Sequence, residues 1–274
     1  MPGDPAPLFE ALEKRRPEDP MPAIFVGHGN PMNAIQDTAF STTWDLLGRR
    51  LPRPQAILCI SAHWLTTGET RVCATDHPAT IHDFHGFPEQ LYDQRYRAPG
   101  APDTARQVIA MVDARRIVAD EEWGLDHGAW SVLLRMFPEA DIPVFQLSLD
   151  YQLPPREHYR LARQLQPLRD KGVLVIGSGN LVHNLGAMRK GAPPYDWAVA
   201  FDAWVTASMD RGADLAVVDF QKTGELARKA HPTWDHFLPL IYALGQRDPA
   251  DHLFYFNEGF DLASISMRSL LLMR

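Results

Sequence analysis

The sequence is short of the features that mark secreted, membrane-spanning and nucleic-acid-binding proteins. Only two of its 274 residues are cysteine, Cys59 and Cys73, and we expect both to be reduced, buried thiols. No apolar run approaches the ~20 residues that cross a bilayer, and the N-terminus lacks the basic-then-apolar build of a signal peptide. Acidic residues exceed basic ones, 34 to 27, so nucleic acid is an unexpected partner. We therefore expect a cytoplasmic protein that binds neither membrane nor nucleic acid.

Several familiar catalytic motifs are also missing. Neither Gly27-His28-Gly29 nor Gly177-Ser178-Gly179 is followed by the further glycine of a dinucleotide-binding fingerprint. The chain has no Gly-x-Ser-x-Gly nucleophile elbow, no His-Glu-x-x-His pair and no cysteine cluster. A phosphate cradle at the turn 177–180 remains an alternative. These absences leave the histidines as the main candidates for chemistry.

The remaining composition is that of a globular α/β protein. Apolar residues make up 45% and charged residues 22% of the chain, which suits a packed core. Short apolar runs alternate with helical patterns, and no linker interrupts them, so we expect a single three-layer domain over 21–274, preceded by an N-terminal extension, 1–20. The main predicted strands are 23–26, 56–61, 70–75, 143–149, 173–177, 253–256 and 264–271, the last two with antiparallel pairing as an option. The main predicted helices are 39–50, 102–114, 129–136, 155–169, 195–209 and 234–244.

Three of the predicted buried strands run into a histidine. His28 follows the first strand, His63 the second and His183 the strand at 173–177, and His236 lies in the first turn of the predicted helix Trp234–Leu244. Ligands of open α/β sheets bind beyond the carboxyl ends of the strands. A single histidine is more often a hydrogen-bonded structural residue, but three at strand ends favour a metal site, because neutral imidazole is a good ligand for zinc and iron.

A long irregular stretch, 76–101, interrupts this alternation. It contains several aromatic residues and prolines together with His82 and His85. Loops of this length inside a compact domain are usually functional. We expect this loop to form a wall or lid of the site, with His82 the stronger candidate and His85 the weaker for the substrate entrance.

Six motifs spread along the chain form a recognisable set. They resemble the 4,5-DOPA extradiol dioxygenase family, which belongs to the class III extradiol ring-cleaving enzymes, and the likeness runs from about Met21 to the C-terminus. The motifs that carry it are Gly27-His28-Gly29-Asn30-Pro31-Met32-Asn33, Ser61-Ala62-His63-Trp64, Thr80-Ile81-His82-Asp83-Phe84, Gly124-Leu125-Asp126-His127-Gly128-Ala129-Trp130, Ser178-Gly179-Asn180-Leu181-Val182-His183-Asn184 and His236-Phe237-Leu238-Pro239-Leu240. The resemblance implies an α/β fold with a mixed, mostly parallel central sheet and one mononuclear metal centre.

The resemblance also implies roles for individual histidines. His28, His63 and His236 correspond to metal ligands, His183 to a residue near the metal that acts as ligand or as acid–base group, and His127 to a residue that faces the substrate. Many class III enzymes have a carboxylate as third ligand where this chain has His236.

The nearest acid to that position is Asp235. A helical neighbour points about 100° away, so we do not expect Asp235 to replace His236 as the ligand. An all-imidazole shell also suits Zn(II), which is plausible as the bound metal.

The expected function is an Fe(II)-dependent extradiol dioxygenase. Such an enzyme inserts O2 into a catechol ring next to the vicinal hydroxyls and opens the ring to a semialdehyde, with a DOPA-like catechol as substrate. Zn(II) has no redox chemistry and cannot support this reaction. We expect His183 to act as the base and His127 to donate a hydrogen bond to the bound oxygen or substrate.

Two alternatives remain: a zinc-dependent hydrolase, and a non-catalytic metal-binding protein on the same fold. The presence of both His127 and His183 beyond the three ligands argues against the second. The partners expected for the dioxygenase are a small catechol and O2, with the chain a monomer or a small homo-oligomer.

Overall fold

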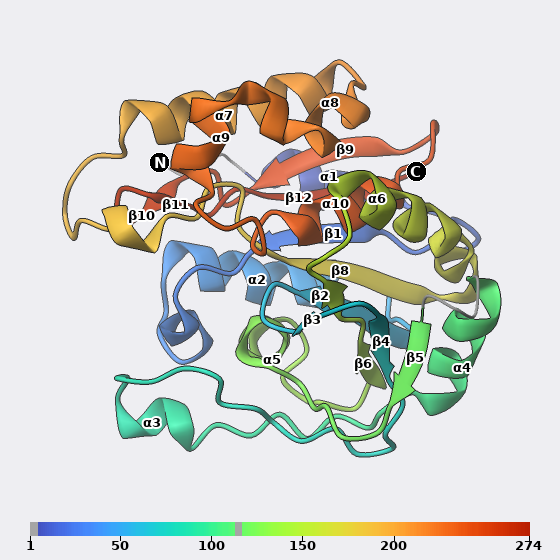
Figure 1. Ribbon diagram of the computed structural model, residues 1–274. Coiled ribbons are helices and arrows are strands. Elements are labelled where there is room, and N and C mark those ends of the chain that lie inside the picture. Colours follow the sequence, from blue (N-terminus) through green and yellow to red (C-terminus); the bar gives the residue numbers. More distant parts are fainter. Residues whose placement is uncertain (1–4, 113–116) are drawn as a thin grey trace.

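A mixed β-sheet forms the centre of the molecule. The computed structural model describes residues 5–112 and 117–274, and in this part of the chain six strands hydrogen bond in the order β6-β2-β8-β1-β12-β9 (Figure 1). Their bounds are β1 Ala23–Gly27, β2 Ala56–Ser61, β6 Val144–Gln146, β8 Val173–Gly179, β9 His252–Phe256 and β12 Ser269–Met273. The first four strands in the order run parallel, whereas β12 pairs antiparallel with both β1 and β9. The predicted mixed, mostly parallel sheet is confirmed.

The central strands are buried on both faces. On β1, Phe25 packs into one hydrophobic cluster, while its neighbours Ile24 and Val26 pack into a second. Val175 and Ile176 on β8 divide between the two clusters in the same way. Since successive strand residues point to opposite faces, a sheet covered on both sides produces the continuous apolar runs that the sequence shows.

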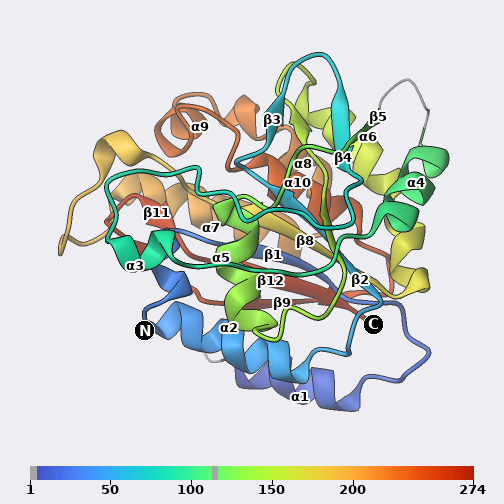
Figure 2. The same ribbon diagram turned by 90° about the horizontal axis from the view of Figure 1, so that it is seen from below.

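Helices supply the two outer layers (Figures 1 and 2). The cluster on one face of the sheet includes residues of α1 (Ala6–Lys14), α2 (Ala39–Arg50) and α5 (His127–Met136). The cluster on the other face includes residues of α4 (Pro102–Met111), α6 (Pro155–Gln164), α7 (Asp196–Asp210), α8 (Asp214–Val218), α9 (Glu225–Ala230) and α10 (Leu238–Gly245). The three-layer α/β architecture is thereby confirmed, and within the described residues no helix is long and apolar enough to cross a membrane.

The N-terminal segment lies on the body of the protein. Leu8 and Leu12 of α1 are buried. The chain that follows is held by Arg169, whose guanidinium donates to the Met21 carbonyl (2.6 Å) and pairs with Asp251 (2.6 Å) in the interior. Hydrogen-bonded charge pairs of this kind tolerate burial because each partner satisfies the other.

The smaller elements lie around the sheet. They are β3 (Leu65–Thr66) with β7 (Leu149–Asp150), β4 (Thr70–Cys73) with β5 (Ile117–Asp120), β10 (Phe260–Asp261) with β11 (Ile265–Ser266), the short helix α3 (Glu89–Tyr92), and the 3-10 turns η1 (Pro31–Ala34), η2 (Gln166–Lys171), η3 (Leu185–Ala187) and η4 (Phe220–Thr223).

Several predicted elements differ from the structure. The strands predicted at 143–149 and 264–271 are each divided between two sheets, as β6 and β7 and as β11 and β12. The strand predicted at 70–75 belongs to the small β4–β5 sheet rather than to the central one. The helix predicted at 102–114 ends at Met111, and its last two predicted residues lie outside the described part of the chain. The helix predicted from Trp234 begins only at Leu238, because 232–237 form turns that lead His236 to the site.

Candidate metal centre

Three histidines reach one edge of the sheet because their strands are parallel neighbours. His28 directly follows β1, His63 lies two residues beyond β2, and His183 lies four residues beyond β8. These strands are adjacent in the order β2-β8-β1, so their carboxyl ends meet. Backbone pairing continues past the strands, since His28 N–H donates to the Gly179 carbonyl at 2.9 Å. The predicted convergence of strand ends is therefore present.

His236 comes to the same edge from the turn before α10. Its carbonyl accepts a hydrogen bond from Asn180 N–H at 2.9 Å. This approach is so close that a Cβ built on Gly179 would lie 2.2 Å from the same carbonyl oxygen. The glycine at the end of β8 is thus required for the packing of the His236 segment against the strand.

The ring centres of His28, His63 and His236 form a nearly regular triangle. They lie 5.1, 5.2 and 5.0 Å apart, and the Nε2 atoms of His28 and His63 are 3.3 Å apart. A metal ion about 2.1 Å from each ring nitrogen at near-tetrahedral angles would hold ring centres about 5 Å apart. The three rings therefore fit a single ion.

Each of these rings has its outer nitrogen engaged by another group. Ser178 Oγ–H donates to the Gly128 carbonyl (2.5 Å), so its oxygen accepts from His28 Nδ1–H at 2.9 Å. His236 Nδ1–H donates to the Asp235 carboxylate, and His63 Nδ1 lies 3.4 Å from a carboxylate oxygen of Asp83. With the proton held on Nδ1, each Nε2 presents a lone pair to the centre, which is the arrangement of histidines that bind metals.

The orientation of Asp235 differs from the one that we expected. It does not lie on a helix, so the 100° offset does not apply, and its carboxylate contacts the ring of His236. His183, Asp235 and His236 bring ligand atoms within 4.8 Å of one another, as do His28, His63 and His127. Asp235 meets His236 at Nδ1, where it orients the ring.

Asp83, from the long loop, joins two of the histidines. One of its oxygens accepts the backbone N–H of His127 (2.8 Å), and the other accepts from His127 Nδ1 (2.9 Å) and lies near His63 Nδ1. Burial acts to raise the pKa of Asp83, but hydrogen bonding and charge interactions with His127 and His63 outweigh it and leave the pKa below its usual value. The carboxylate is therefore ionised at neutral pH and acts as an acceptor only.

His127 lies against His63, and His183 lies against His236. His127 is the first residue of α5, because the side chain of Asp126 accepts Ala129 N–H and caps that helix. Its ring centre is only 3.9 Å from that of His63. The ring of His183 stacks on His236, with centres 3.5 Å apart and planes within 5°.

Burial keeps the candidate ligands neutral. It is the main cause that lowers the pKa values of His28, His63 and His236, and repulsion between the neighbouring rings adds to the effect. Burial also lowers the pKa of His183 to about 4. Neutral imidazoles are the form that binds metals, so the donor set suits a divalent cation.

All five predicted site histidines open into one cavity of about 470 Å³. Its lining residues are His28, Gly29, Asn30, Pro31, His63, Phe84, His85, Phe87, His127, His183, Leu185, Met188, His236, Asp261, Leu262 and Ile265. The long loop contributes Phe84, His85 and Phe87, which fits its expected role as a wall. His82 was the stronger candidate for the entrance, but it is His85 that lines the cavity, while His82 contacts Gln94.

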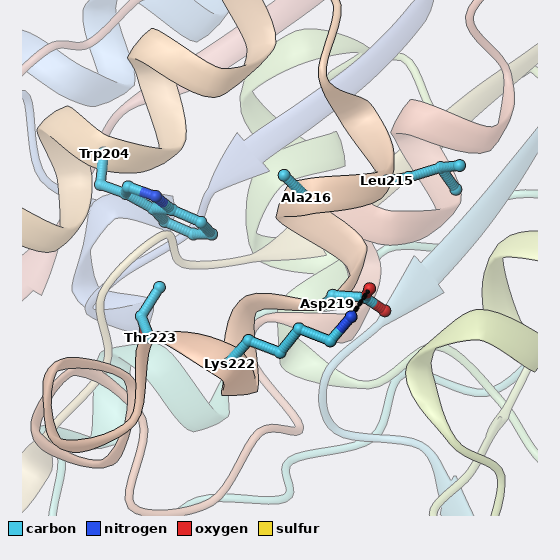
Figure 3. Close-up of a pocket in the computed structure, with 6 residues that line it drawn as sticks. All are labelled: Trp204, Leu215, Ala216, Asp219, Lys222 and Thr223. Atoms are coloured by element: carbon cyan, nitrogen blue, oxygen red, sulfur yellow. Dashed lines mark hydrogen bonds and ion pairs between the residues drawn. The ribbon is translucent and has the colours of Figure 1, made fainter.

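A second cavity, of about 420 Å³, lies between α7, α8 and η4 (Figure 3). Trp204 and Leu215 face it, and Lys222 pairs with Asp219 at its rim (2.6 Å). It contains no histidine or cysteine. Of these two cavities, only the histidine cavity brings together groups that could hold a metal.

Four residues of the site were not identified from the sequence: Asp83, Ser178, Asp235 and Asp261. Asp83 and Ser178 lie inside motifs that the sequence analysis quoted, and their carboxylate and hydroxyl groups are typical partners for the outer nitrogen of a ligating histidine. Their chemistry could therefore have identified them from the sequence. Asp261 lies in no recognised motif, and nothing in the sequence pointed to it.

Comparisons with known proteins agree with this geometry. A family model described as "Catalytic LigB subunit of aromatic ring-opening dioxygenase" matches residues 25–261. The chain is 42% identical to the 4,5-DOPA dioxygenase extradiol of Escherichia coli (strain K12), over 91% of this chain and 94% of that protein. It is 40% identical to the Beta vulgaris protein of the same name, over 81% and 85%. A crystal structure of an uncharacterized protein from Escherichia coli K12 superposes with a TM-score of 0.79 at 38% identity, over 92% of this chain and 99% of that one.

Proposed function

The chain belongs to the family of catalytic LigB subunits of aromatic ring-opening dioxygenases, and from that membership we propose that it opens a DOPA-like catechol with O2 at a metal centre held by three histidines. It is an extradiol ring-cleaving oxidoreductase. The observation that carries the proposal is the triangle of His28, His63 and His236, which line a cavity large enough for a catechol.

These three histidines are the proposed ligands. Their ring centres are evenly spaced, whereas His127 lies 3.9 Å from His63 and 5.9 Å from His28, which suits a shared ion less well. The metal is proposed to be Fe(II) in the active enzyme, and Zn(II) is compatible with the same ligands. The chemistry that a redox-active ion supplies is the joint binding of catecholate and O2, with electron exchange between them.

His183 is proposed as the base that takes a phenolic proton. A ligating imidazole holds its metal close to the plane of its own ring. The rings of His183 and His236 are stacked, with centres 3.5 Å apart and planes within 5° of parallel, so they do not point to a common ion. This supports an acid–base role over the ligand role for His183. Among the described residues no side chain hydrogen bonds to its ring, so a nitrogen is available to a substrate hydroxyl in the cavity.

His127 is proposed to contact the substrate through Nε2. Its Nδ1 is engaged by Asp83 (2.9 Å), so the other nitrogen is the one available to the cavity. In the neutral ring this nitrogen accepts a hydrogen bond from a catechol hydroxyl, and in the imidazolium it donates one.

The extent of the catalytic unit, its partners and its compartment are also proposed. We take residues 21–274 as the catalytic unit, with a catechol and O2 as partners, and the cytoplasm as the site of action. The two cysteines support a reducing compartment, since both are buried and unbridged.

Single substitutions test these roles. His28→Ala, His63→Ala and His236→Ala should each lose the metal, measured by elemental analysis after iron loading under argon. His183→Ala and His127→Ala should keep it and lower kcat by about 100- to 10,000-fold, the range for general acid–base groups.

The surface residue His252 offers a control. His252→Ala should keep both metal and activity. Ring cleavage is read as O2 uptake and a yellow product on a panel of catechols. Activity with Zn(II) alone, or full metal and activity in all five site variants, would contradict the proposal.

A further inference from the structure

Among the described residues, Asp261 is the single acidic side chain that lines the histidine cavity. No lysine or arginine of this part of the chain lines it. The carboxyl group of Asp261 is partly buried, which raises its pKa above the usual value, and in the described part of the chain no basic side chain forms an ion pair with it. A carboxylate in a cavity therefore lacks a protein counter-ion.

A basic residue does lie beside this segment, but it is turned elsewhere. Arg189 donates its backbone N–H to the Leu262 carbonyl at 2.8 Å. Its guanidinium lies over the ring of Tyr195, 5.6 Å from the centroid. The guanidinium of Arg189 therefore lies against an aromatic ring, and it forms no ion pair with Asp261.

The strand pairing sets Asp261 in line with His183. Ile265 forms an antiparallel bridge with His183 and is the register partner of Asp261 in the β10–β11 hairpin. Directly opposed residues of antiparallel strands share a face and lie about 5 Å apart. The side chains of His183, Ile265 and Asp261 all line the cavity. Two such steps across the strands put the Cβ atoms of Asp261 and His183 about 10 Å apart. This separation suits a catechol whose hydroxyls lie at His183 and whose side arm extends to Asp261.

The turn after Asp261 is held in an uncommon backbone conformation. Leu262 and Ala263 have φ of 49° and 66°, in the left-handed region that non-glycine residues rarely adopt. Their carbonyls accept hydrogen bonds from Arg189 and Tyr195 N–H groups, at 2.8 and 3.1 Å. Backbone strain of this kind is concentrated at ligand sites, and here it directly follows Asp261, which lines the cavity.

We propose that Asp261 binds a cationic group on the side arm of the catechol and so selects catechols whose arm bears an ammonium group over those whose arm bears a carboxylate without an ammonium group. The proposal rests on the ring-cleaving function proposed above and concerns the same cavity. An ammonium group regains at Asp261 the interaction that it loses on leaving water, whereas a carboxylate arm meets a like charge without a compensating cation. Leu185 and Ile265 offer apolar contacts to the methylene groups between ring and ammonium.

Three catechols that differ in the arm at ring carbon 4 test this selectivity: 2-aminoethyl, ethyl and 2-carboxyethyl. With the iron-loaded enzyme, Asp261→Asn should lower kcat/KM for the aminoethyl compound at least tenfold. It should leave the ethyl compound within twofold and raise kcat/KM for the carboxyethyl compound. Glu258→Gln is the matched control, since Glu258 lies near the same hairpin, pairs with Arg268 and does not line the cavity. It should change none of the ratios.

Binding without turnover gives a second readout. Calorimetric titration with 4-(2-aminoethyl)phenol and 4-ethylphenol should show a preference for the amine that Asp261→Asn removes and that rising salt weakens. Cleavage of the ethyl compound together with equal effects of Asp261→Asn on all three arms would overturn the role of Asp261. Failure of the iron-loaded wild type to open any of the three catechols would instead overturn the proposed function.

Discussion

Asp83→Asn is the substitution that probes the outer shell of the metal centre most directly. The amide keeps the size of the side chain but replaces one acceptor oxygen by an NH2 group. In the wild type the two oxygens accept from His127 N–H (2.8 Å) and His127 Nδ1–H (2.9 Å), and the second also faces His63 Nδ1 at 3.4 Å. In the variant the NH2 group faces either the His127 backbone N–H, which then loses its acceptor, or the two Nδ1–H groups, which then lose theirs. If His63 then takes its other tautomer, the proton on Nε2 occupies the lone pair that the metal needs.

The size of the effect follows from these contacts. Loss of an outer-shell partner weakens metal binding by about 10- to 100-fold, or about 1.4 to 2.7 kcal/mol. We expect the lower end, about tenfold, because the contact to His63 is the longest of the three and His127 is not a proposed ligand. The affinity is measured by competition for Zn(II) and Fe(II) against a chromophoric chelator.

A matched control is available in Asp120. This half-buried carboxylate also accepts backbone N–H groups and pairs with a side-chain cation, Arg71 at 3.0 Å, away from the site. Asp120→Asn should leave the dissociation constant for the metal unchanged. A dissociation constant for Asp83→Asn within twofold of both the wild type and Asp120→Asn would show that Asp83 does not orient the ligands.

Two further predictions concern stability. Gly179→Ala places a Cβ 2.2 Å from the His236 carbonyl oxygen. It should lower the free energy of unfolding by about 1–3 kcal/mol and weaken metal binding, as measured by urea unfolding with and without metal. Gly186→Ala, at an exposed glycine without close backbone neighbours, should change neither quantity. Burial lowers the pKa of His158 to about 4, so between pH 6.5 and pH 4 the unfolded chain binds a proton there that the folded chain does not, and stability is lost as the pH falls. His158→Gln, which can keep a hydrogen bond to Tyr242 (3.1 Å in the wild type), should remove about 2–3 kcal/mol of this acid loss; equal slopes of unfolding free energy against pH in the two proteins would refute the assignment.

The sequence by itself determined the fold class and the positions of the site histidines. Strands covered on both faces must be apolar at every position, as in Ala23–Gly27 and Val173–Gly179, and such runs are visible without coordinates. The ends of parallel strands meet at one edge. His28, His63 and His183 could therefore be grouped from their distance to a strand end alone.

Only the tertiary structure decided which groups orient those histidines and which residues face the substrate. Asp83 and His85 lie in the long loop, whose path depends on contacts with distant segments such as His127 and carries no periodicity that a sequence reveals. The start of α10 was misplaced because the turn at Asp235 is held by packing of His236 against β8. Asp261 enters the cavity through pairing of β10 with β11 and of Ile265 with His183. Such partners are separated by many residues along the chain, and their contact is a property of the folded molecule.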